Sequence, residues 1–265
     1  MKKKIIIILS LFIFISLSLS SNCYSTPKES NASGVFYKAN ALFKEGKYEQ
    51  AKDEYASILN LGIESGNLYY NLGNAYFKLG KLGKAILNYE RAKLFIPQDS
   101  DSKSNLDFAR SLLESPLIFK KQNFVTRFLE KLSDYFSLDG LSVIVSGLYF
   151  ILFFSIAVSM LHRKGPAFFK YLINIGFILL FIFGCVWGVK FYRTQIQQYA
   201  IIITSFADCR FAPAEDAVTH FRVYEGAKVN ILNKDGNWRR IKTPDAKIGW
   251  IKDTALERIV SLKNI

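Results

Sequence analysis

Few side chains in this chain of 265 residues are suited to covalent or metal chemistry. Cys209 and His220 are the pair that suggests a thiol nucleophile beside a base, the arrangement that activates a cysteine for attack. No third group that would orient the base accompanies them, and such a pair is more often incidental. Cys23 and Cys185 stand in unrelated apolar segments, so the cysteines predict neither a disulfide framework nor a metal cluster. We therefore expect a protein that is not an enzyme and that needs no metal or cofactor.

Side chains suited to recognition are more frequent. Asn40 and Asn74 are separated by 34 residues, and so are Lys44 and Lys78. Asparagine amides can hold an extended peptide backbone through paired hydrogen bonds, while neighbouring aromatic rings supply apolar contact. The candidate partner-binding residues, which are consistent with one helical side, are Phe36, Asn40, Lys44, Tyr70, Asn71, Asn74 and Lys78. The alternative is that the aromatic residues only pack in a core and that the lysines only face solvent.

The same spacing extends through the segment that must position these side chains. It relates Ala39 to Gly73, Phe43 to Phe77, Gly46 to Gly80, Ala51 to Ala85 and Tyr55 to Tyr89. The period of 34 residues, with Tyr69, Leu72, Gly73, Tyr76, Ala85, Tyr89 and Pro97 in the second copy, resembles the tetratricopeptide repeat. The resemblance implies an all-α solenoid over residues 33–115, made of two repeats and a capping helix. It also implies that partners bind the inner face of the first helix of each pair.

Small residues indicate how these helices meet. Gly73 and Ala85 lack bulk where two antiparallel helices approach, and Gly46 and Gly80 suit turns with a left-handed backbone. Some repeats of this family clamp a C-terminal carboxylate with a lysine at the position of Phe36, so that ligand class is not favoured. Two repeats and a cap are fewer than the three that usually make a stable stack, so we expect another surface to complete it.

Two long uncharged runs, residues 141–161 and 171–189, lie after the repeats. At about 1.5 Å of rise per residue, the first covers roughly 31 Å, which is enough to cross a bilayer. Residues 162–170 between the runs hold Arg163, Lys164 and Lys170, and short basic loops stay in the cytoplasm. We expect a two-pass hairpin in a bacterial inner membrane, with both flanking parts in the periplasm. Two buried helices of a soluble domain are the alternative, although runs of this length are unusual there.

Residues 1–25 have three lysines, an apolar run and then small residues, which is the plan of a signal peptide or signal anchor. Cleavage near residue 25, retention as an anchor and lipidation of Cys23 all remain open, and each exports the repeat region. The net charge of +13 is concentrated at this end and beside the apolar runs. Neither flanking part therefore carries the basic patch of a nucleic-acid binder.

Residues 116–140 form an amphipathic linker helix in this prediction. Apolar residues recur at helical spacing over residues 124–136, with charged residues opposite. The helix either lies in the membrane interface or docks on the repeats, and the sequence favours neither.

Residues 199–259 change to short β-rich pieces separated by turns. Strands are expected at 200–204, 229–232, 238–241 and 249–251, with turns at residues 235–237 and 243–245. The order of Arg210, Pro213, Gly236, Trp238, Gly249 and Trp250 resembles the bacterial SH3-like domain, a small all-β barrel. Trp238 and Trp250 either stabilise this barrel or, for Trp238 with Arg210, form a shallow surface for a peptide or cell-wall fragment.

The order of exported repeats, membrane hairpin and SH3-like barrel resembles the BatE-type proteins of bacterial aerotolerance operons. That resemblance implies a multidomain, non-enzymatic scaffold that works with membrane-anchored von Willebrand factor A-domain proteins and, indirectly, a MoxR-type ATPase. The alternative function is an envelope sensor whose barrel binds peptidoglycan or its peptides.

Overall fold

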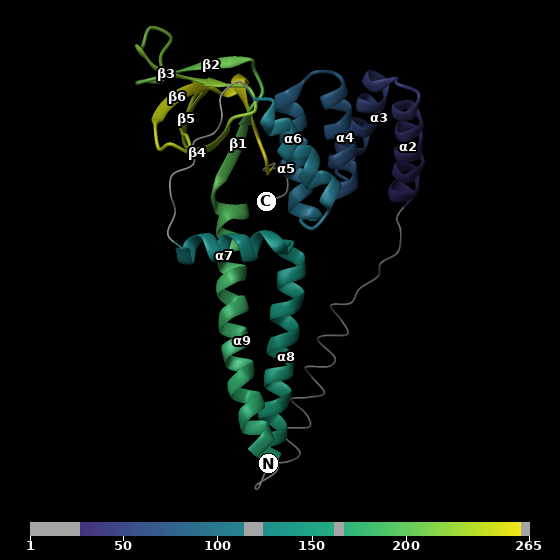
Figure 1. Cartoon of the computed structure of the whole chain (residues 1–265), viewed down its shortest axis with the longest axis vertical. Coiled ribbons are helices and arrows are strands. Elements are labelled where there is room, and N and C mark those ends of the chain that lie inside the picture. The colour runs from purple at the N-terminus through teal and green to yellow at the C-terminus, as the bar shows by residue number, and fades with distance from the viewer. Residues whose placement is uncertain (1–26, 114–123, 162–166, 261–265) are drawn as a thin grey trace.

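The computed structural model describes residues 27–113, 124–161 and 167–260. A group of helices and a sheet lie side by side at one end of a long helical hairpin (Figure 1). The prediction of a helical repeat region, two long apolar helices and a small β domain is confirmed. The expected signal segment 1–25, with Cys23, and the loop residues Arg163 and Lys164 lie outside the described residues.

Five helices form the repeat region. They are α2 (Pro27–Lys44), α3 (Tyr48–Asn60), α4 (Gly66–Lys78), α5 (Leu82–Phe95) and α6 (Ser100–Ser111). The side chain of Ser65 caps the start of α4 by accepting from the amide of Leu68 at 3.2 Å. Asp99 caps α6 in the same way, accepting from the amide of Ser102 at 2.7 Å. Helices α2 and α3 form the first hairpin, α4 and α5 form the second, and α6 packs on α5.

The glycines take the places that the repeat predicts. Gly46 and Gly80 have φ angles of +78° and +72°, the left-handed conformation that only glycine adopts cheaply. A Cβ atom on Gly73 would meet the ring of Tyr89 at 2.7 Å, so a side chain there would force α4 away from α5. Both predictions from the small residues are confirmed.

The amphipathic segment and the two apolar runs form α7 (Phe124–Tyr135), α8 (Leu138–Leu161) and α9 (Ala167–Phe191). Helix α8 begins before the uncharged run because Ser137 caps it, accepting from the Gly140 amide at 3.0 Å. Helix α9 begins at Ala167, so residues 167–170 are helical and do not belong to a loop as expected.

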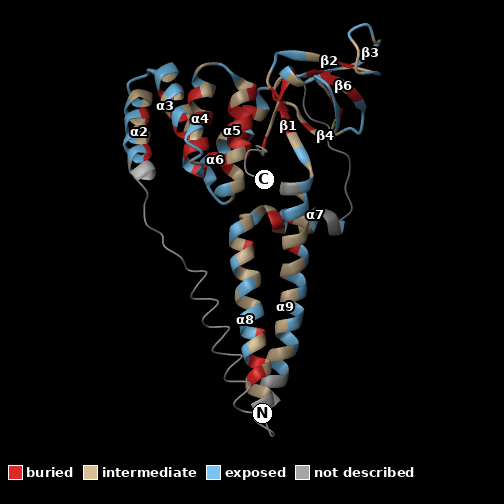
Figure 2. Cartoon of the chain, turned by 180° about the vertical axis from the view of Figure 1, so that it is seen from behind, coloured by how far each residue is buried: buried red, intermediate tan, exposed pale blue. Residues whose placement is uncertain are grey.

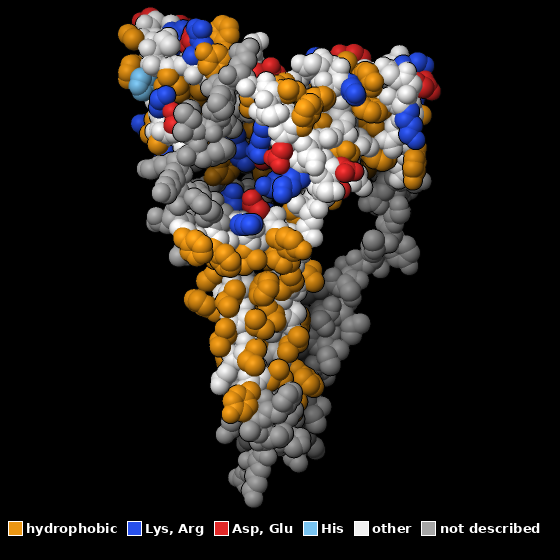
Figure 3. Space-filling model, in the orientation of Figure 1, with side chains coloured by type: hydrophobic (Ala, Val, Ile, Leu, Met, Phe, Trp, Pro, Cys, Tyr) orange, Lys and Arg blue, Asp and Glu red, His pale blue; other side chains and the backbone are white. Residues whose placement is uncertain are grey.

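Helices α8 and α9 are long and apolar enough to span a membrane. Only 17% and 6% of their most apolar windows are buried, and most of both helices is coloured exposed or intermediate in Figure 2. Apolar side chains cover the face of the hairpin that Figure 3 shows. Buried core helices would show the opposite distribution, so this alternative is not supported. Helix α7 lies across the end of the hairpin (Figure 1) and packs on α9.

A short π-helix, η1 (Tyr192–Ile196), leads from α9 into an antiparallel sheet. Its strands are β1 (Gln198–Ile202), β2 (Phe206–Arg210), β3 (Thr219–Tyr224), β4 (Lys228–Asp235), β5 (Trp238–Lys242), β6 (Ile248–Lys252) and β7 (Leu256–Arg258), in the order β3-β2-β6-β5-β4-β1-β7. The sheet curls into an open, barrel-like form around its own core, which includes Val229, Ile241 and Ile251.

The sheet also completes the core of the repeats. Ile201 of β1 and Ile259 after β7 are buried in one cluster with Ile86 and Leu87 of α5 and Leu106 of α6. Buried residues accordingly line the boundary between α5 and β1 (Figure 2). The surface that completes the two-repeat stack is therefore the β domain.

Candidate functional site

A groove runs along the first helices of the repeats. It consists of two adjoining hollows of about 230 and 330 Å³ that share Phe43 and Asn74. The first is lined by Asn40, Phe43, Lys44, Tyr55, Asn71 and Asn74, and the second by Phe43, Asn74, Phe77, Lys78, Tyr89, Asn105 and Phe108. Five of the seven residues proposed from the sequence thus line one continuous surface.

Asparagines and tyrosines form a repeated set of hydrogen bonds in this groove. The Oδ1 atom of Asn40 accepts from Tyr55 Oη at 2.6 Å and from Asn71 Nδ2 at 2.9 Å. One repeat later, Asn74 Oδ1 accepts from Tyr89 Oη at 2.7 Å and from Asn105 Nδ2 at 2.9 Å. We call these two sets the asparagine ladder.

Reasoning from the sequence misses Asn105. It lies in the capping helix α6, one repeat period after Asn71, and it occupies the corresponding place in the second set. The repeat period is the signal that identifies it, once the spacing is extended past the second copy.

The asparagine ladder also has a structural role. Tyr55 and Tyr89 are each only 1% exposed, and the asparagine oxygens satisfy their hydroxyl groups. Burial raises the pKa of Tyr55 to about 12 and also raises the pKa of Tyr89, so both hydroxyls remain protonated donors at neutral pH. Replacing Asn40 or Asn74 would therefore disturb the fold as well as the groove.

Phe36 and Tyr70 support the groove and are not among the residues that line the two hollows. The ring of Phe36 packs on Tyr55, with 5.9 Å between centroids. The hydroxyl of Tyr70 accepts from Asn105 Nδ2 at 3.2 Å, and its ring lies 6.2 Å from that of Tyr89. Core packing is thus part of the role of both aromatic residues.

Lys44 and Lys78 are exposed beside the groove. Neither forms an ion pair with a described residue, in contrast to Lys38, Lys47, Lys52 and Lys81 of the same region. The groove therefore presents amides, aromatic surface and two positive charges.

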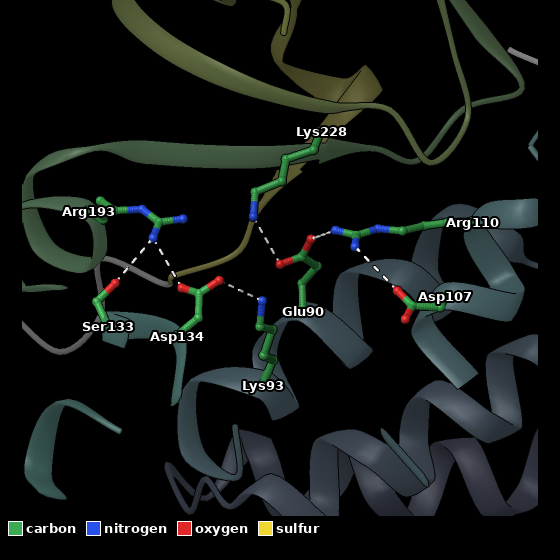
Figure 4. A network of polar contacts seen from close by, with 8 residues as sticks. All are labelled: Glu90, Lys93, Asp107, Arg110, Ser133, Asp134, Arg193 and Lys228. Atoms are coloured by element: carbon green, nitrogen blue, oxygen red, sulfur yellow. Dashed lines mark hydrogen bonds and ion pairs between the residues drawn. The ribbon is translucent and has the colours of Figure 1, made fainter. Parts of the chain in front are cut away.

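A second polar cluster joins the repeats to the sheet (Figure 4). Glu90 of α5, whose side chain is 5% exposed, pairs with Lys228 of β4 at 2.9 Å and with Arg110 of α6. Burial alone would raise the pKa of the Glu90 carboxyl, but these two cations outweigh it and hold the pKa at about 2. Glu90 is therefore ionised and links three elements.

Other contacts extend this junction. Arg91 donates to Glu257 at 2.9 Å and to the carbonyl oxygen of Arg258 at 2.7 Å, and the Gly83 amide donates to Glu225 at 2.7 Å. The Gly83 position needs glycine, because a Cβ atom there would lie 2.6 Å from the carbonyl oxygen of Ile202.

Asp134 of α7 connects the same junction to the hairpin (Figure 4). It pairs with Lys93 of α5 at 3.0 Å and with Arg193 of η1 at 3.1 Å. Burial opposes ionisation of Asp134, but the two cations prevail and lower the pKa of its carboxyl. Helix α7 thus contacts both the repeats, which is one of its two expected positions, and the apolar hairpin, while its position in a membrane interface stays a prediction.

In the sheet, Arg210 and Trp238 do come together, with the guanidinium carbon 5.7 Å from the ring centroid. However, Arg210 also donates to the carbonyl oxygens of Ala214, Glu215 and Ala217 and so fixes the β2–β3 loop. Lys252 lies near the same ring at 6.0 Å and pairs with Glu215. These contacts favour a structural role for the pair.

Cys209 and His220 do not form a catalytic pair. Cys209 is fully buried, and this burial raises the pKa of its thiol to about 12, so a thiolate is strongly disfavoured. His220 is exposed and stacks on Phe211, with its Nδ1 atom 3.3 Å from the carbonyl oxygen of Ile248. Within the described ranges, no group of three or more Cys, His, Asp or Glu side chains is arranged to hold a metal ion.

One model of a known protein family matches a part of the chain. The family model of the tetratricopeptide repeat matches residues 66–99, which cover α4, α5 and the turn before α6. The comparison with curated proteins gives no match. Repeats of this family are interaction modules, so the matched region supports a role in binding another protein.

Proposed function

We propose that this protein is a non-enzymatic scaffold of the bacterial inner membrane, whose repeats hold an extended segment of a partner protein in the periplasm. The asparagine ladder beside Lys44 and Lys78 is the observation that carries this proposal. The apolar hairpin α8–α9 would anchor the scaffold, with the repeats and the sheet outside the cytoplasm.

The groove suggests the chemistry of the bound segment. The oxygens of Asn40 and Asn74 are used internally, but their Nδ2 atoms donate to none of the described residues. These donors suit backbone carbonyl groups of an extended peptide, and Lys44 and Lys78 suit acidic side chains in it. By the resemblance to BatE-type proteins, the partners would be membrane-anchored von Willebrand factor A-domain proteins and, through them, a MoxR-type ATPase.

The alternative, a sensor of peptidoglycan, has less support. Its proposed surface uses Arg210 and Trp238, and Arg210 is already engaged with three backbone carbonyl groups. All three contacts use its Nη1 atom and hold the guanidinium on the β2–β3 loop, which is a structural role, although its Nε and Nη2 atoms donate to none of the described residues.

Crosslinking in native membranes tests the scaffold. A photoreactive residue is placed at position 44 or 78 of the full chain, with position 103 as the control, since Lys103 is exposed on α6 away from the two groove hollows. Adducts with a von Willebrand factor A-domain protein are expected at 44 and 78 but not at 103. The pair Lys44→Glu and Lys78→Glu should abolish co-purification of that protein, whereas Lys103→Glu should not. Equal adducts at all three positions would contradict the groove as the binding surface.

A further inference from the structure

A cavity lies where the repeats, the sheet and the end of the hairpin meet. It is lined by Glu90, Lys93, Leu94, Asp134, Lys190, Arg193, Thr194, Gln197, Tyr199, Lys228, Ile259 and Val260. Its volume is about 60 Å³. This is several times the space that a single water molecule needs. Charged side chains gather on the surface here, directly beside the apolar hairpin (Figure 3).

The charges that line this cavity do not cancel. Four cations, Lys93, Lys190, Arg193 and Lys228, face two carboxylates, Glu90 and Asp134. Each carboxylate is already shared, since Lys93 and Arg193 both pair with Asp134, while Lys228 pairs with Glu90 beside Arg110. The lining therefore holds two positive charges in excess.

Lys190 is the residue that most needs an external partner. It is 6% exposed, lines the cavity, and its ammonium group forms no ion pair or hydrogen bond with any residue in the described parts of the chain. The carboxylate of Asp134 attracts this ammonium group without direct contact and already pairs with Lys93 and Arg193. An ammonium group removed from water without a directly paired counter-ion is strongly unfavourable, so an anion in the cavity would satisfy it.

The depth of the cavity points to the source of that anion. The apolar span of α9 begins at Tyr171, and Lys190 lies one helical turn before its end at Thr194. A helix crosses the hydrocarbon core in about 20 residues, and Lys190 lies about that far along the helix from Tyr171. The cavity therefore lies at the level of the lipid headgroups, on the side of the membrane where the repeats and the sheet lie. Basic pockets at this level suit the phosphate of anionic lipids.

We propose that this cavity binds a phosphate group, supplied by the headgroup of an anionic phospholipid, with Lys190 as its principal contact. The inference depends on the proposed membrane location but concerns a different ligand and a different surface from the partner-binding groove. Free phosphate offers the same chemistry, so the experiment separates the two sources.

The test measures the thermal midpoint of the full chain in neutral detergent during titration with phosphatidylglycerol, phosphatidylcholine or inorganic phosphate. Phosphatidylglycerol should raise the midpoint at the lowest concentration, because phosphatidylcholine carries its own cation and free phosphate lacks the apolar anchor. Lys190→Met should raise the half-saturating concentration of phosphatidylglycerol about tenfold, the loss expected for one charge-assisted hydrogen bond. Lys190→Arg should keep the response.

Lys131→Met is the matched control, because Lys131 is an exposed lysine of α7 that does not line the cavity. A response to inorganic phosphate that phosphatidylglycerol does not exceed would overturn the lipid as the source. Equal responses in Lys190→Met, Lys131→Met and the unchanged chain would overturn the site itself. Partner crosslinking at positions 44 and 78 would be unaffected by either result, so a failure here is distinct from a failure of the scaffold.

Discussion

The first and second helical hairpins share one repeat pattern but differ on their outer helices. The corresponding positions are Glu49 and Gly83, Lys52 and Ile86, Asp53 and Leu87, and Ala56 and Glu90. In α3, Glu49 and Asp53 are exposed and pair with Lys52, whereas in α5 the residues at all four positions are buried against neighbouring elements. Positions at which the two repeats differ thus lie where the sheet packs on α5, while positions at which the two repeats have the same residue line the groove.

The largest expected difference in stability between the two helical hairpins comes from a buried carboxylate in the second, Glu90, and a partly exposed one in the first, Glu54. Glu90→Gln should lower the free energy of opening at the α5–β1 boundary by about 3 to 5 kcal/mol, because Lys228 and Arg110 would lose their buried partner. Glu54→Gln in the first hairpin removes a largely exposed pair with Lys38 and should cost less than about 1 kcal/mol. Hydrogen exchange of the amides in α5 and β1 measures the first effect, and exchange of the amides in α2 and α3 measures the second. Similar costs for the two changes would refute the distinction.

Acid should affect the second hairpin selectively. The pKa of Glu90 is about 2 in the folded protein and 4.5 ordinarily, so the unfolded chain binds the proton first as the pH falls. Stability from this group is full above about pH 4.5 and should decline by about 3 kcal/mol as the pH approaches 2. Hydrogen exchange at the α5–β1 boundary at pH 5 and pH 3 detects the loss. Glu90→Gln should flatten this pH dependence, and an unchanged slope in that variant would exclude Glu90 as its origin.

Close approach at Gly83 offers a third comparison. Gly83→Ala should destabilise the contact between α5 and β1 by about 1 to 3 kcal/mol, since the new methyl group would meet a backbone oxygen and the side chain of Glu225. The methyl group added by Gly34→Ala in α2 would have no atom within 4 Å, so this change should be neutral or stabilising by up to about 1 kcal/mol. Thermal midpoints of the two variants provide the measurement. A loss at Gly34 as large as at Gly83 would contradict this comparison, because neither close packing nor helix propensity predicts a loss at Gly34.

The smallest expected effect concerns the start of the second hairpin. Ser65→Ala should cost about 1 kcal/mol, because the side chain accepts the Leu68 amide at the beginning of α4. Ser57→Ala in α3 is the control, since its hydroxyl only donates to a carbonyl oxygen on an exposed face. Denaturant titration monitored by helical circular dichroism should separate them; no loss from Ser65→Ala would show that the cap is dispensable.

Much of this architecture can be predicted from sequence periodicity, and the rest depends on long-range contacts. The repeat spacing predicts the two helical hairpins, Asn40 and Asn74, because identical local geometry recurs at each copy, and the shared helical side adds Asn71. The β-rich segment is predicted as a small barrel, but β2, β3 and β7 are not, since β7 has only three residues and both β2 and β3 mix charged side chains with their apolar ones.

The junction could not be predicted from the sequence. Glu90 and Lys228 are far apart along the chain, and each resembles an ordinary surface charge until the sheet packs against α5. The burial of Lys190 likewise results from the meeting of α5, α7 and β4 around the end of α9. Only the loss of charge at Gly83, Ile86 and Leu87 relative to the first repeat is a local signal, and it indicates a covered face without identifying the element that covers it.

The path from α9 to β1 has a mechanical consequence. Only Gln197 separates the π-helix η1 from β1, and Ile201 of that strand is embedded in the core of the repeats. Because no flexible linker lies along this path, the apolar hairpin α8–α9 and the groove proposed to bind a partner move as one mechanical unit. A tilt of α9 would therefore reorient the groove, and a force on a segment bound in the groove would be transmitted to α9. The π-helix η1 is the segment through which both displacements would pass.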